Sequence, residues 1–302
     1  MTAPPAGRDA ARQALLDAAT PWVFVAIWST GFVVARLAMP HAPPLTFLSW
    51  RYALSLAAFG LWIAAARLPW PRGRAQWGHL AVSGVLMHAG YLGGVWAAVR
   101  AGAPAGTVAL IVGLQPLLTA LWVSGRGQQA VAPLQWLGLW LGLAGLAAVV
   151  WPKLAQGEVT PLNLALSLAA LASITVGTLY QKRHVLPGDV RTANAVQIGA
   201  ALLVSLPLAW LEPGRLDWHP DLLAALAWSV LGLTLGGSSL LTLLIQRGAA
   251  TRVTSLLYLV PPCTALLAWW MFDERMAASG WAGMALCALG VGLVLRHEAP
   301  RA

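Results

Sequence analysis

The stretch LQPLLTAL at residues 114–121 recurs, 145 residues later, as LVPPCTAL at residues 259–266. Five of the eight positions are identical, and both stretches lie within long apolar runs. Each contains a proline, which costs about 3 kcal/mol in the interior of a helix. A helix breaker that returns in the same apolar context indicates that the chain contains an internal repeat.

The repeat extends well beyond these stretches, and chance similarity between apolar segments does not explain matched tryptophan, glycine and proline. At an offset of 145 residues, Pro116, Thr119, Trp136, Gly138 and Gly145 align with Pro261, Thr264, Trp281, Gly283 and Gly290; at an offset of 146 residues, Thr46 and Arg51 align with Thr192 and Gln197. We therefore expect two repeated halves, residues 1–152 and residues 153–302.

The composition is typical of a membrane protein. Of the 302 residues, 59% are hydrophobic and 10% are charged, whereas a soluble domain has about 25% charged residues. Ten apolar segments are long enough to cross a bilayer, which predicts an all-α polytopic membrane protein. They cover roughly residues 20–37, 45–65, 77–98, 103–124, 133–151, 162–181, 192–211, 222–245, 253–272 and 279–295. Each half then holds five transmembrane helices, an odd number, so the halves are predicted to be inverted-topology repeats.

Lysine and arginine are distributed unevenly between the two sides of the predicted bundle. With the N-terminus inside, the inside segments carry thirteen of these residues and the outside gaps carry five. Because cytoplasmic loops are enriched in Lys and Arg, both termini are predicted to be cytoplasmic. Arginine outnumbers lysine 17 to 2, which is typical of a GC-rich bacterial genome and favours a bacterial inner membrane.

Several kinds of partner and cofactor are not expected. The net charge of +9 does not indicate nucleic-acid binding, because the basic residues lie in short gaps between apolar runs. Cys263 and Cys287 lie within apolar runs without metal-ligand spacing, and no glycine-rich stretch has the lysine of a phosphate-binding loop. We expect no cofactor and no metal. The expected partners are the lipid bilayer and a small-molecule substrate, and the chain is expected to be a monomer, with a dimer as the alternative.

Motifs spread over nearly the whole chain resemble those of the EamA-type family in the drug/metabolite transporter superfamily. They are IWSTGFVVAR at 27–36, PPLTFLSWRY at 43–52, GTVALIVGLQPLLTAL at 106–121, GTLYQKR at 177–183 and LVPPCTALLAWWMFDERM at 259–276. The resemblance implies helices around a central cavity and the export or exchange of small metabolites. It also implies an acidic residue, as a Gly-Glu pair, thirteen positions after each repeated proline. Asp273-Glu274 in the second half conforms to this pattern, whereas Gln128-Gln129 in the first half departs from it.

Arg51 is the most informative single residue, because it lies about seven residues inside the second predicted span. A charge at that depth is costly and usually faces the protein interior or a water-filled path. We expect Arg51 to bind an anionic group such as a substrate carboxylate. The alternatives are that it extends towards the membrane surface or bonds to carbonyls and locks two helices together.

The other candidates for the cavity are polar or aromatic residues within spans. His88 and Tyr91 are three residues apart and share a helix face; His88 either relays protons or bonds to a neighbouring helix. Trp28 and Tyr258 are expected to form aromatic cavity walls. Gln115 and Gln197, the repeat mate of Arg51, are further candidates, although hydrogen bonds between helices explain many such residues.

The repeated prolines predict two helix kinks. Pro116 and Pro261 would free a carbonyl four residues back, which is tolerated in a membrane only where protein or water satisfies it. The kinks should therefore face protein or the cavity, with Thr119 and Thr264 on the same face helping to bend the helix. A gating role and a purely structural role both remain open.

The sequence as a whole favours an inner-membrane secondary transporter, acting as an exporter of amino-acid-like or other small solutes by alternating access. No Asp or Glu lies within a predicted span core, so proton-coupled export of lipophilic cations has no obvious carrier. Facilitated diffusion, exchange and histidine-based coupling remain. The alternatives to transport are an integral-membrane group-transfer enzyme, for which the chain has no HxxxxD motif, and a membrane scaffold.

The charge bias gives a testable topology. Reporter fusions placed at residues 212–221 should be active outside the cell, and fusions at residues 184–191 should be active inside it. Enzymatic reporters that work on only one side of the membrane make the measurement. The reverse pattern would contradict the predicted orientation.

Overall fold

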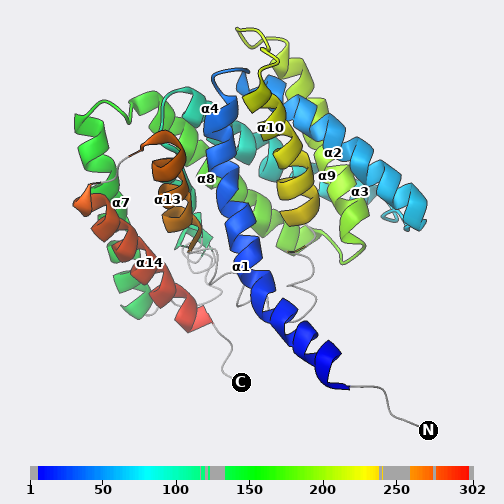
Figure 1. Ribbon diagram of the computed structural model, residues 1–302, viewed down its shortest axis with the longest axis horizontal. Helices are drawn as coiled ribbons and strands as arrows, with labels where there is room; N and C mark the ends of the chain where they lie inside the picture. Colours follow the sequence, from blue (N-terminus) through cyan, green and yellow to red (C-terminus); the bar gives the residue numbers. More distant parts are fainter. Residues whose placement is uncertain are drawn as a thin grey trace.

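The computed structural model describes residues 6–115, 117–119, 122, 133–237, 240, 259–274 and 277–298, and all regular structure in these ranges is helical. The helices form a bundle, and α1 crosses the middle of the view in Figure 1. They are α1 (Ala6–Ala38), α2 (Pro44–Ala66), α3 (Arg74–Gly84), η1 (Val85–Gly90), α4 (Tyr91–Arg100), α5 (Ala105–Val112), α7 (Pro133–Ala155), α8 (Pro161–His184), α9 (Val190–Ala209), α10 (Pro220–Trp228), η2 (Ser229–Gly237), α13 (Val260–Phe272) and α14 (Ala278–Glu298).

The described helices agree with the predicted class of membrane protein, although not all of them reach spanning length. Six stretches are long and apolar enough to cross a membrane: Pro44–Ala66, Arg74–Arg100, Trp136–Ala155, Pro161–His184, Val190–Ala209 and Pro220–Gly237. Four shorter apolar stretches are Trp22–Ala38, Ala105–Thr119, Val260–Phe272 and Ala278–Gly290. The all-α polytopic fold is confirmed, and the count of ten spans stays a prediction.

The start of α2 is held by a residue from the opposite half of the sequence. The backbone N–H groups of Leu45 and Thr46 donate to the two carboxylate oxygens of Glu212, at 3.0 and 2.9 Å. The first N–H groups of a helix lack partners within the helix, and a carboxylate there also suits the positive end of the helix dipole. Because Glu212 follows α9, this cap joins the α1–α2 connection to the α9–α10 connection.

Helices α7 and α14 cross at glycines and run antiparallel. Gly145 meets Gly283, and further along, Gly138 and Gly142 meet Gly290. The residue number rises along α7 while it falls along α14, so the two helices point in opposite directions, as they also do where they lie side by side in Figure 1. The missing side chains let the two backbones approach closely, which is the usual way for membrane helices to associate.

These glycine contacts show how the two halves are related. Gly145 and Gly290 are repeat mates, as are Gly138 and Gly283. If each glycine is replaced by its repeat mate, the contact between Gly145 and Gly283 becomes the contact between Gly290 and Gly138. The structure contains both contacts. A contact and its exchanged copy across an antiparallel pair are what a pseudo-two-fold axis between inverted repeats produces.

A second matched feature, which the sequence did not reveal, is a pair of π-helical segments. Segment η1 at Val85–Gly90 lies between α3 and α4, and η2 at Ser229–Gly237 directly follows α10. An offset of 146 residues carries 85–90 onto 231–236, within η2. Segments of π-helix are rare and are frequent at functional sites, and the repeat places one in each half.

The proline pair is described only in part. Pro116 lies outside the described residues, and α5 ends just before it at Val112. Pro261 lies in the first turn of α13, which begins at Val260. There the missing N–H costs no hydrogen bond, so Pro261 lies at the start of this helix. The sequence instead predicts it in the interior of a helix.

The two threonines that follow the prolines make different hydrogen bonds. Thr119 Oγ1 donates to the carbonyl of Gln115, four residues back, at 2.9 Å. Thr264, fully buried, donates to the carbonyl of Ser29 on α1 at 3.0 Å. Thr264 therefore ties α13 to α1, and a gating role for these residues stays a prediction.

The glycine crossing predicts a site-specific loss of stability. A Cβ on Gly283 would lie 2.6 Å from the carbonyl oxygen of Gly145 and 2.8 Å from Cγ2 of Val149, so Gly283→Ala must push α7 and α14 apart. We expect this substitution to cost about 1–3 kcal/mol of unfolding free energy. The measurement is the thermal midpoint of the detergent-solubilised protein.

The same helix provides a matched control. Gly292 also lies on α14, and a Cβ there would meet nothing within 4 Å. Gly292→Ala should leave stability unchanged or raise it by up to about 1 kcal/mol, because alanine favours a helix over glycine. Equal midpoints for the two variants would contradict the close crossing.

Candidate functional site

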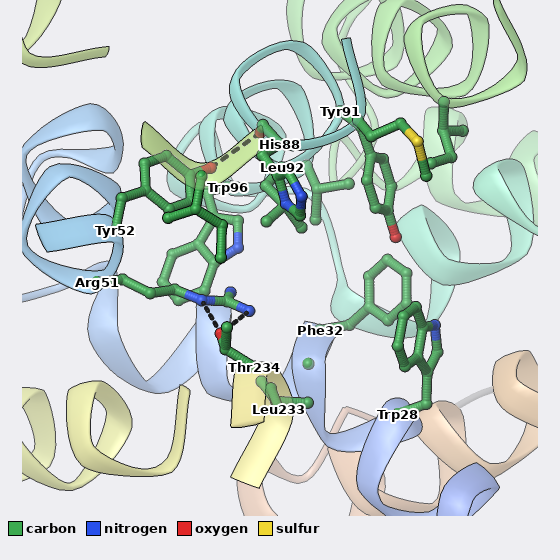
Figure 2. Close-up of a pocket in the computed structure, with 15 residues that line it drawn as sticks. Trp28, Phe32, Arg51, Tyr52, His88, Tyr91, Leu92, Trp96, Leu233 and Thr234 are labelled. Carbon is green, nitrogen blue, oxygen red and sulfur yellow. Dashed lines mark hydrogen bonds between the residues drawn. The ribbon is translucent and has the colours of Figure 1, made fainter. Parts of the chain in front are cut away.

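A cavity of about 130 Å³ lies within the bundle, between helices of both halves (Figure 2). Most of its wall is aromatic or aliphatic. Trp28 and Phe32 contribute from α1, Tyr91 and Trp96 from α4, and Leu233 from η2. Enclosed apolar cavities with a few polar groups are the usual form of a small-molecule site.

Arg51 brings the charge to this cavity. It lies on α2 with 8% of its surface exposed, and its guanidinium points into the cavity in Figure 2. Nε and Nη2 lie 3.4 and 3.3 Å from Oγ1 of Thr234, which itself donates to the carbonyl of Ser229 at 2.8 Å. Among the described residues, no salt bridge joins Arg51 to a carboxylate. A buried guanidinium without a carboxylate is suited to an anionic ligand.

A tyrosine and a histidine lie beside the arginine. Oη of Tyr52 donates to the backbone carbonyl of His88 at 2.9 Å, and the two rings meet edge to face at 6.3 Å. His88 belongs to η1, and another carbonyl of this segment, that of Leu86, also accepts from a side chain, Oγ of Ser173 at 2.8 Å. His88 and Tyr91 both line the cavity.

The polar contacts around the cavity follow the repeat. Arg51 and Gln197 are mates at the offset of 146 residues, and the same offset pairs His88 with Thr234. Arg51 bonds to Thr234, and His88 interacts with the side chain of Gln197. Each contact is therefore the exchanged copy of the other. Because the first joins α2 to η2 and the second joins η1 to α9, both connect one half to the other.

The structure brings together four of the residues proposed from the sequence. Trp28, Arg51, His88 and Tyr91 all line the cavity, although substrate binding by them stays a prediction. Tyr258 lies outside the described residues.

The two glutamines do not line the cavity. Nε2 of Gln197 donates to Oγ of Ser83 and to Oε1 of Gln181, both at 3.0 Å, in a buried network behind His88. Gln115 donates to Oγ1 of Thr178 at 3.0 Å and so links two helices. Both serve as ties between helices in this structure, in agreement with the alternative that the sequence left open.

Several residues of the cavity wall were not predicted from the sequence, above all Thr234 and Tyr52. Thr234 had a signal, because it is the mate of His88 at the same offset that pairs Arg51 with Gln197. Tyr52 adjoins Arg51, but its contact with His88 depends on how the helices pack. Phe32 and Trp96 look like any other core residue in an apolar helix.

A second and more polar cavity of about 640 Å³ lies at one end of the bundle. Its charged groups are largely paired, since Lys153 bonds to Glu158 at 3.0 Å and Arg36 lies 3.4 Å from Glu274. Glu274 also accepts from the N–H of Ala105, the first residue of α5, at 3.2 Å. Burial raises the pKa of Glu274, against the opposing effect of Arg36. This carboxylate is a helix cap, so the first cavity is the better candidate for a binding site.

Comparison with known proteins agrees with this architecture. The chain is similar over 89% of its length to an uncharacterized transporter, YvbV, of Bacillus subtilis, with 25% identity over 88% of that protein. It is 22% identical to a protein named probable amino-acid metabolite efflux pump of Escherichia coli, over 91% of this chain and 93% of that one. A protein of known crystal structure superposes with a TM-score of 0.63 at 19% identity, over 92% of this chain and 98% of that one, which shows a shared fold.

The family model is matched twice along the sequence. The model of the EamA-like transporter family aligns with residues 22–151 and again with residues 162–296. The two matches together cover most of the chain and correspond to the two related sets of helices. The protein is therefore a multi-pass membrane protein that belongs to the EamA-like transporter family.

Proposed function

We propose that this protein is a secondary transporter that exports small metabolites carrying a carboxylate, with Arg51 as the anchor for that group. The observation that carries the proposal is the buried guanidinium, which faces an apolar cavity and has no salt bridge to a carboxylate among the described residues. The similarity to a protein named as an amino-acid metabolite efflux pump supports the same class of substrate.

The size and wall of the cavity suggest the rest of the substrate. Its volume of about 130 Å³ is close to that of an engineered cavity of about 150 Å³ that binds benzene. The wall includes Trp28, Phe32, Tyr91 and Trp96, whose rings offer flat apolar surfaces. A small carboxylate with a compact apolar or aromatic body fits these conditions, and an amino-acid-like solute is the example we favour.

The mechanism that we propose is alternating access between the two halves, residues 1–152 and residues 153–302. Arg51 and Thr234 lie on opposite halves, and so do His88 and Gln197. A substrate carboxylate competes with Thr234 for the guanidinium and thereby weakens one contact between the halves. Binding would then shift the population between inward-open and outward-open forms.

We also propose a cellular location for the protein and a transport role in place of catalysis. A bacterial inner membrane with both termini in the cytoplasm is supported by the distribution of Lys and Arg. A transport role in place of catalysis is supported by relatives named as transporters or efflux pumps.

The role of Arg51 is tested with paired substrates in liposomes containing the purified protein. Flux of small aromatic and aliphatic amino acids is compared with flux of their carboxamides. Arg51→Gln should lower carboxylate flux at least about tenfold, because a hydrogen bond to a charged group contributes about 1.5–3 kcal/mol. Carboxamide flux should change little.

The control for this test is Arg191→Gln. Arg191 lies outside the cavity and bonds to Asp189 at 2.7 Å, so its replacement should leave the carboxylate preference intact. Unchanged carboxylate flux in Arg51→Gln would remove the arginine from the site.

A second prediction concerns the stability cost of the buried charge. Replacing a buried ion pair by apolar side chains of similar volume is often neutral or stabilising by about 1–4 kcal/mol. Arg51 has no carboxylate partner among the described residues, so its replacement leaves no opposite charge behind. We expect Arg51→Met to keep or raise the thermal midpoint in detergent while transport is lost.

Gln197, the repeat mate of Arg51, supplies a control for which the expected change in stability has the opposite sign. Gln197→Met removes donors to Ser83 and Gln181 and should lower stability by about 1–3 kcal/mol, because buried partners are left unsatisfied. A lower midpoint for Arg51→Met as well would favour the alternative in which the arginine locks helices together.

A further inference from the structure

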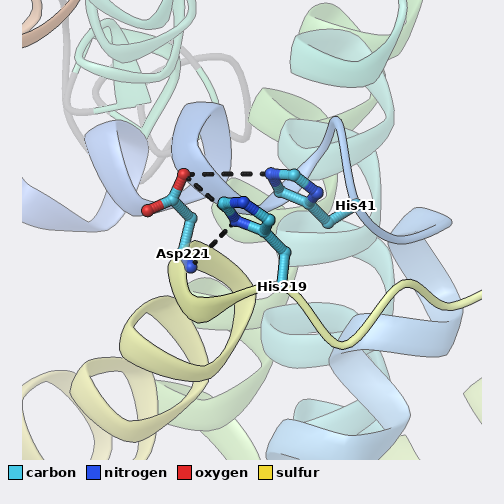
Figure 3. A group of neighbouring side chains, drawn as sticks. All are labelled: His41, His219 and Asp221. Atoms are coloured by element: carbon cyan, nitrogen blue, oxygen red, sulfur yellow. Dashed lines mark hydrogen bonds and ion pairs between the residues drawn. The ribbon is translucent and has the colours of Figure 1, made fainter.

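Two histidines and two aspartates meet at the end of the bundle where α1 ends and α10 begins. His41 lies in the α1–α2 connection, while Asp217 and His219 lie in the α9–α10 connection and Asp221 is in the first turn of α10. The two imidazole rings stack in parallel with centroids 4.2 Å apart. Figure 3 shows Asp221 reaching across to both rings. The cluster is remote from the cavity around Arg51 and shares no residue with its wall.

The partners of His41 determine where its proton lies. Nδ1 is 3.2 Å from Oδ2 of Asp217, and a carboxylate can only accept, so Nδ1 is the protonated nitrogen. Nε2 of the neutral ring then carries a lone pair. That lone pair faces Oδ2 of Asp221 at 3.9 Å, which is too long for a direct hydrogen bond.

The same reasoning applies to His219. Its Nδ1 accepts a hydrogen bond from the backbone N–H of Asp221 at 3.2 Å, because His219 caps the start of α10. Nδ1 is therefore unprotonated, its lone pair is engaged by this N–H, and it lies 3.4 Å from the same Oδ2 of Asp221. One ligand atom from each of His41, His219 and Asp221 lies within 4.8 Å of the others. Two unprotonated imidazole nitrogens and a carboxylate oxygen at this spacing repel one another unless a cation or a proton lies between them.

We propose that this cluster is a binding site for a divalent transition metal ion, with Zn²⁺ as the best fit. The ligands are Nε2 of His41, Nδ1 of His219 and Oδ2 of Asp221, and water completes a tetrahedron. Binding replaces the hydrogen bond from the N–H of Asp221 to Nδ1 of His219 and turns the two rings out of their parallel stack, so that the three atoms lie about 2.0–2.2 Å from the metal. Neutral imidazole nitrogens select zinc over calcium or magnesium, which prefer oxygen ligands only.

Asp217 supports the metal by accepting a hydrogen bond from the other ring nitrogen of His41. A metal-binding histidine usually donates its other N–H to a carboxylate, which fixes the ring and makes the ligand nitrogen more basic. The bond from Nδ1 of His41 to Asp217 has this form. The side chains of His219 and Asp221 are 45% and 50% exposed, so a metal ion can enter from the solvent.

Because of its position, the site is expected to let a bound metal slow transport. This step rests on the proposed function. The ligands come from the first half (His41) and the second half (His219 and Asp221). The same connections are already joined by the bond from the N–H of Asp217 to the carbonyl of His41, at 2.8 Å, and by the Glu212 cap on α2. A bound metal would hold this end closed and slow the alternation. The charge bias places this end on the outside, where the ion would act from outside the cell.

Metal binding is measured first, without transport. The full chain is purified in detergent with an affinity tag free of histidine, and ZnCl₂ is titrated against a chromophoric zinc chelator; Co²⁺ absorption then reports the ligand geometry. We expect one tight site per chain. His41→Ala, His219→Ala and Asp221→Asn should each weaken it at least about tenfold, and Asp217→Asn should weaken it about 10–100-fold.

A second pair of histidines supplies the control. His79 and His184 lie near each other beside Tyr180, away from the proposed site, so His184→Ala should not change zinc affinity. Asp221→Asn keeps the shape of the side chain, and therefore separates loss of ligand from loss of fold. Zinc binding that is absent in the wild type, or that is equal in all variants, would overturn the proposal. A cluster that binds protons but no zinc would also overturn it, because protons alone would then lie between the imidazole nitrogens and the carboxylate.

Transport is measured second, in liposomes with zinc added to the side exposing His41. Zinc should slow flux in the wild type and not in His41→Ala, with each protein compared with its own flux without zinc. Binding without any effect on flux would leave the metal site intact and contradict only its coupling to transport. A failure of the Arg51 test would leave the binding result untouched.

Discussion

The absence of water inside a bilayer is the constraint on which the rest of this structure depends. Every backbone N–H and C=O within the membrane must find a partner in the protein, so the described chain is helical throughout its regular structure. Some hydroxyl groups within the helices bond back to carbonyls of their own helix, as Ser29 does to Val25 and Thr175 does to Leu171. Polar side chains with longer reach are turned inward, and Arg51 is the most costly of them.

The repeat then decides how the inward-facing groups are arranged. The glycine crossing of α7 and α14 and the paired π-segments show that the two halves offer the same framework in opposite orientations. The framework is symmetric, but the side chains are not. Arg51 faces Thr234 on one side of the axis, while Gln197 faces His88 on the other. The guanidinium that faces the cavity therefore belongs to one half, which gives the cavity a preferred place for an anionic group.

Particular residues show how far the sequence predicts the site. A charge in an apolar span is conspicuous, so Arg51 was found, and His88, Tyr91 and Trp28 followed from their spacing and type. Gln115 and Gln197 are equally polar, yet they bond to neighbouring helices. Sequence pattern does not separate these outcomes, because a cavity-lining residue and a residue between helices occupy the same kind of helix face. The cluster of His41 and His219 was also hidden, since its residues come from two distant connections.

The sequence by itself determined the helical membrane fold, the inverted repeat and the depth of Arg51, because hydropathy, matched positions and charge are local properties of the chain. Only the tertiary structure decided which polar groups share a cavity, where Pro261 lies relative to its helix and that His41, His219 and Asp221 lie close together. Those outcomes depend on the rotation of each helix about its axis and on close packing between helices distant in sequence. Glycine contacts and hydrogen bonds between the halves set that rotation, and no single segment encodes it.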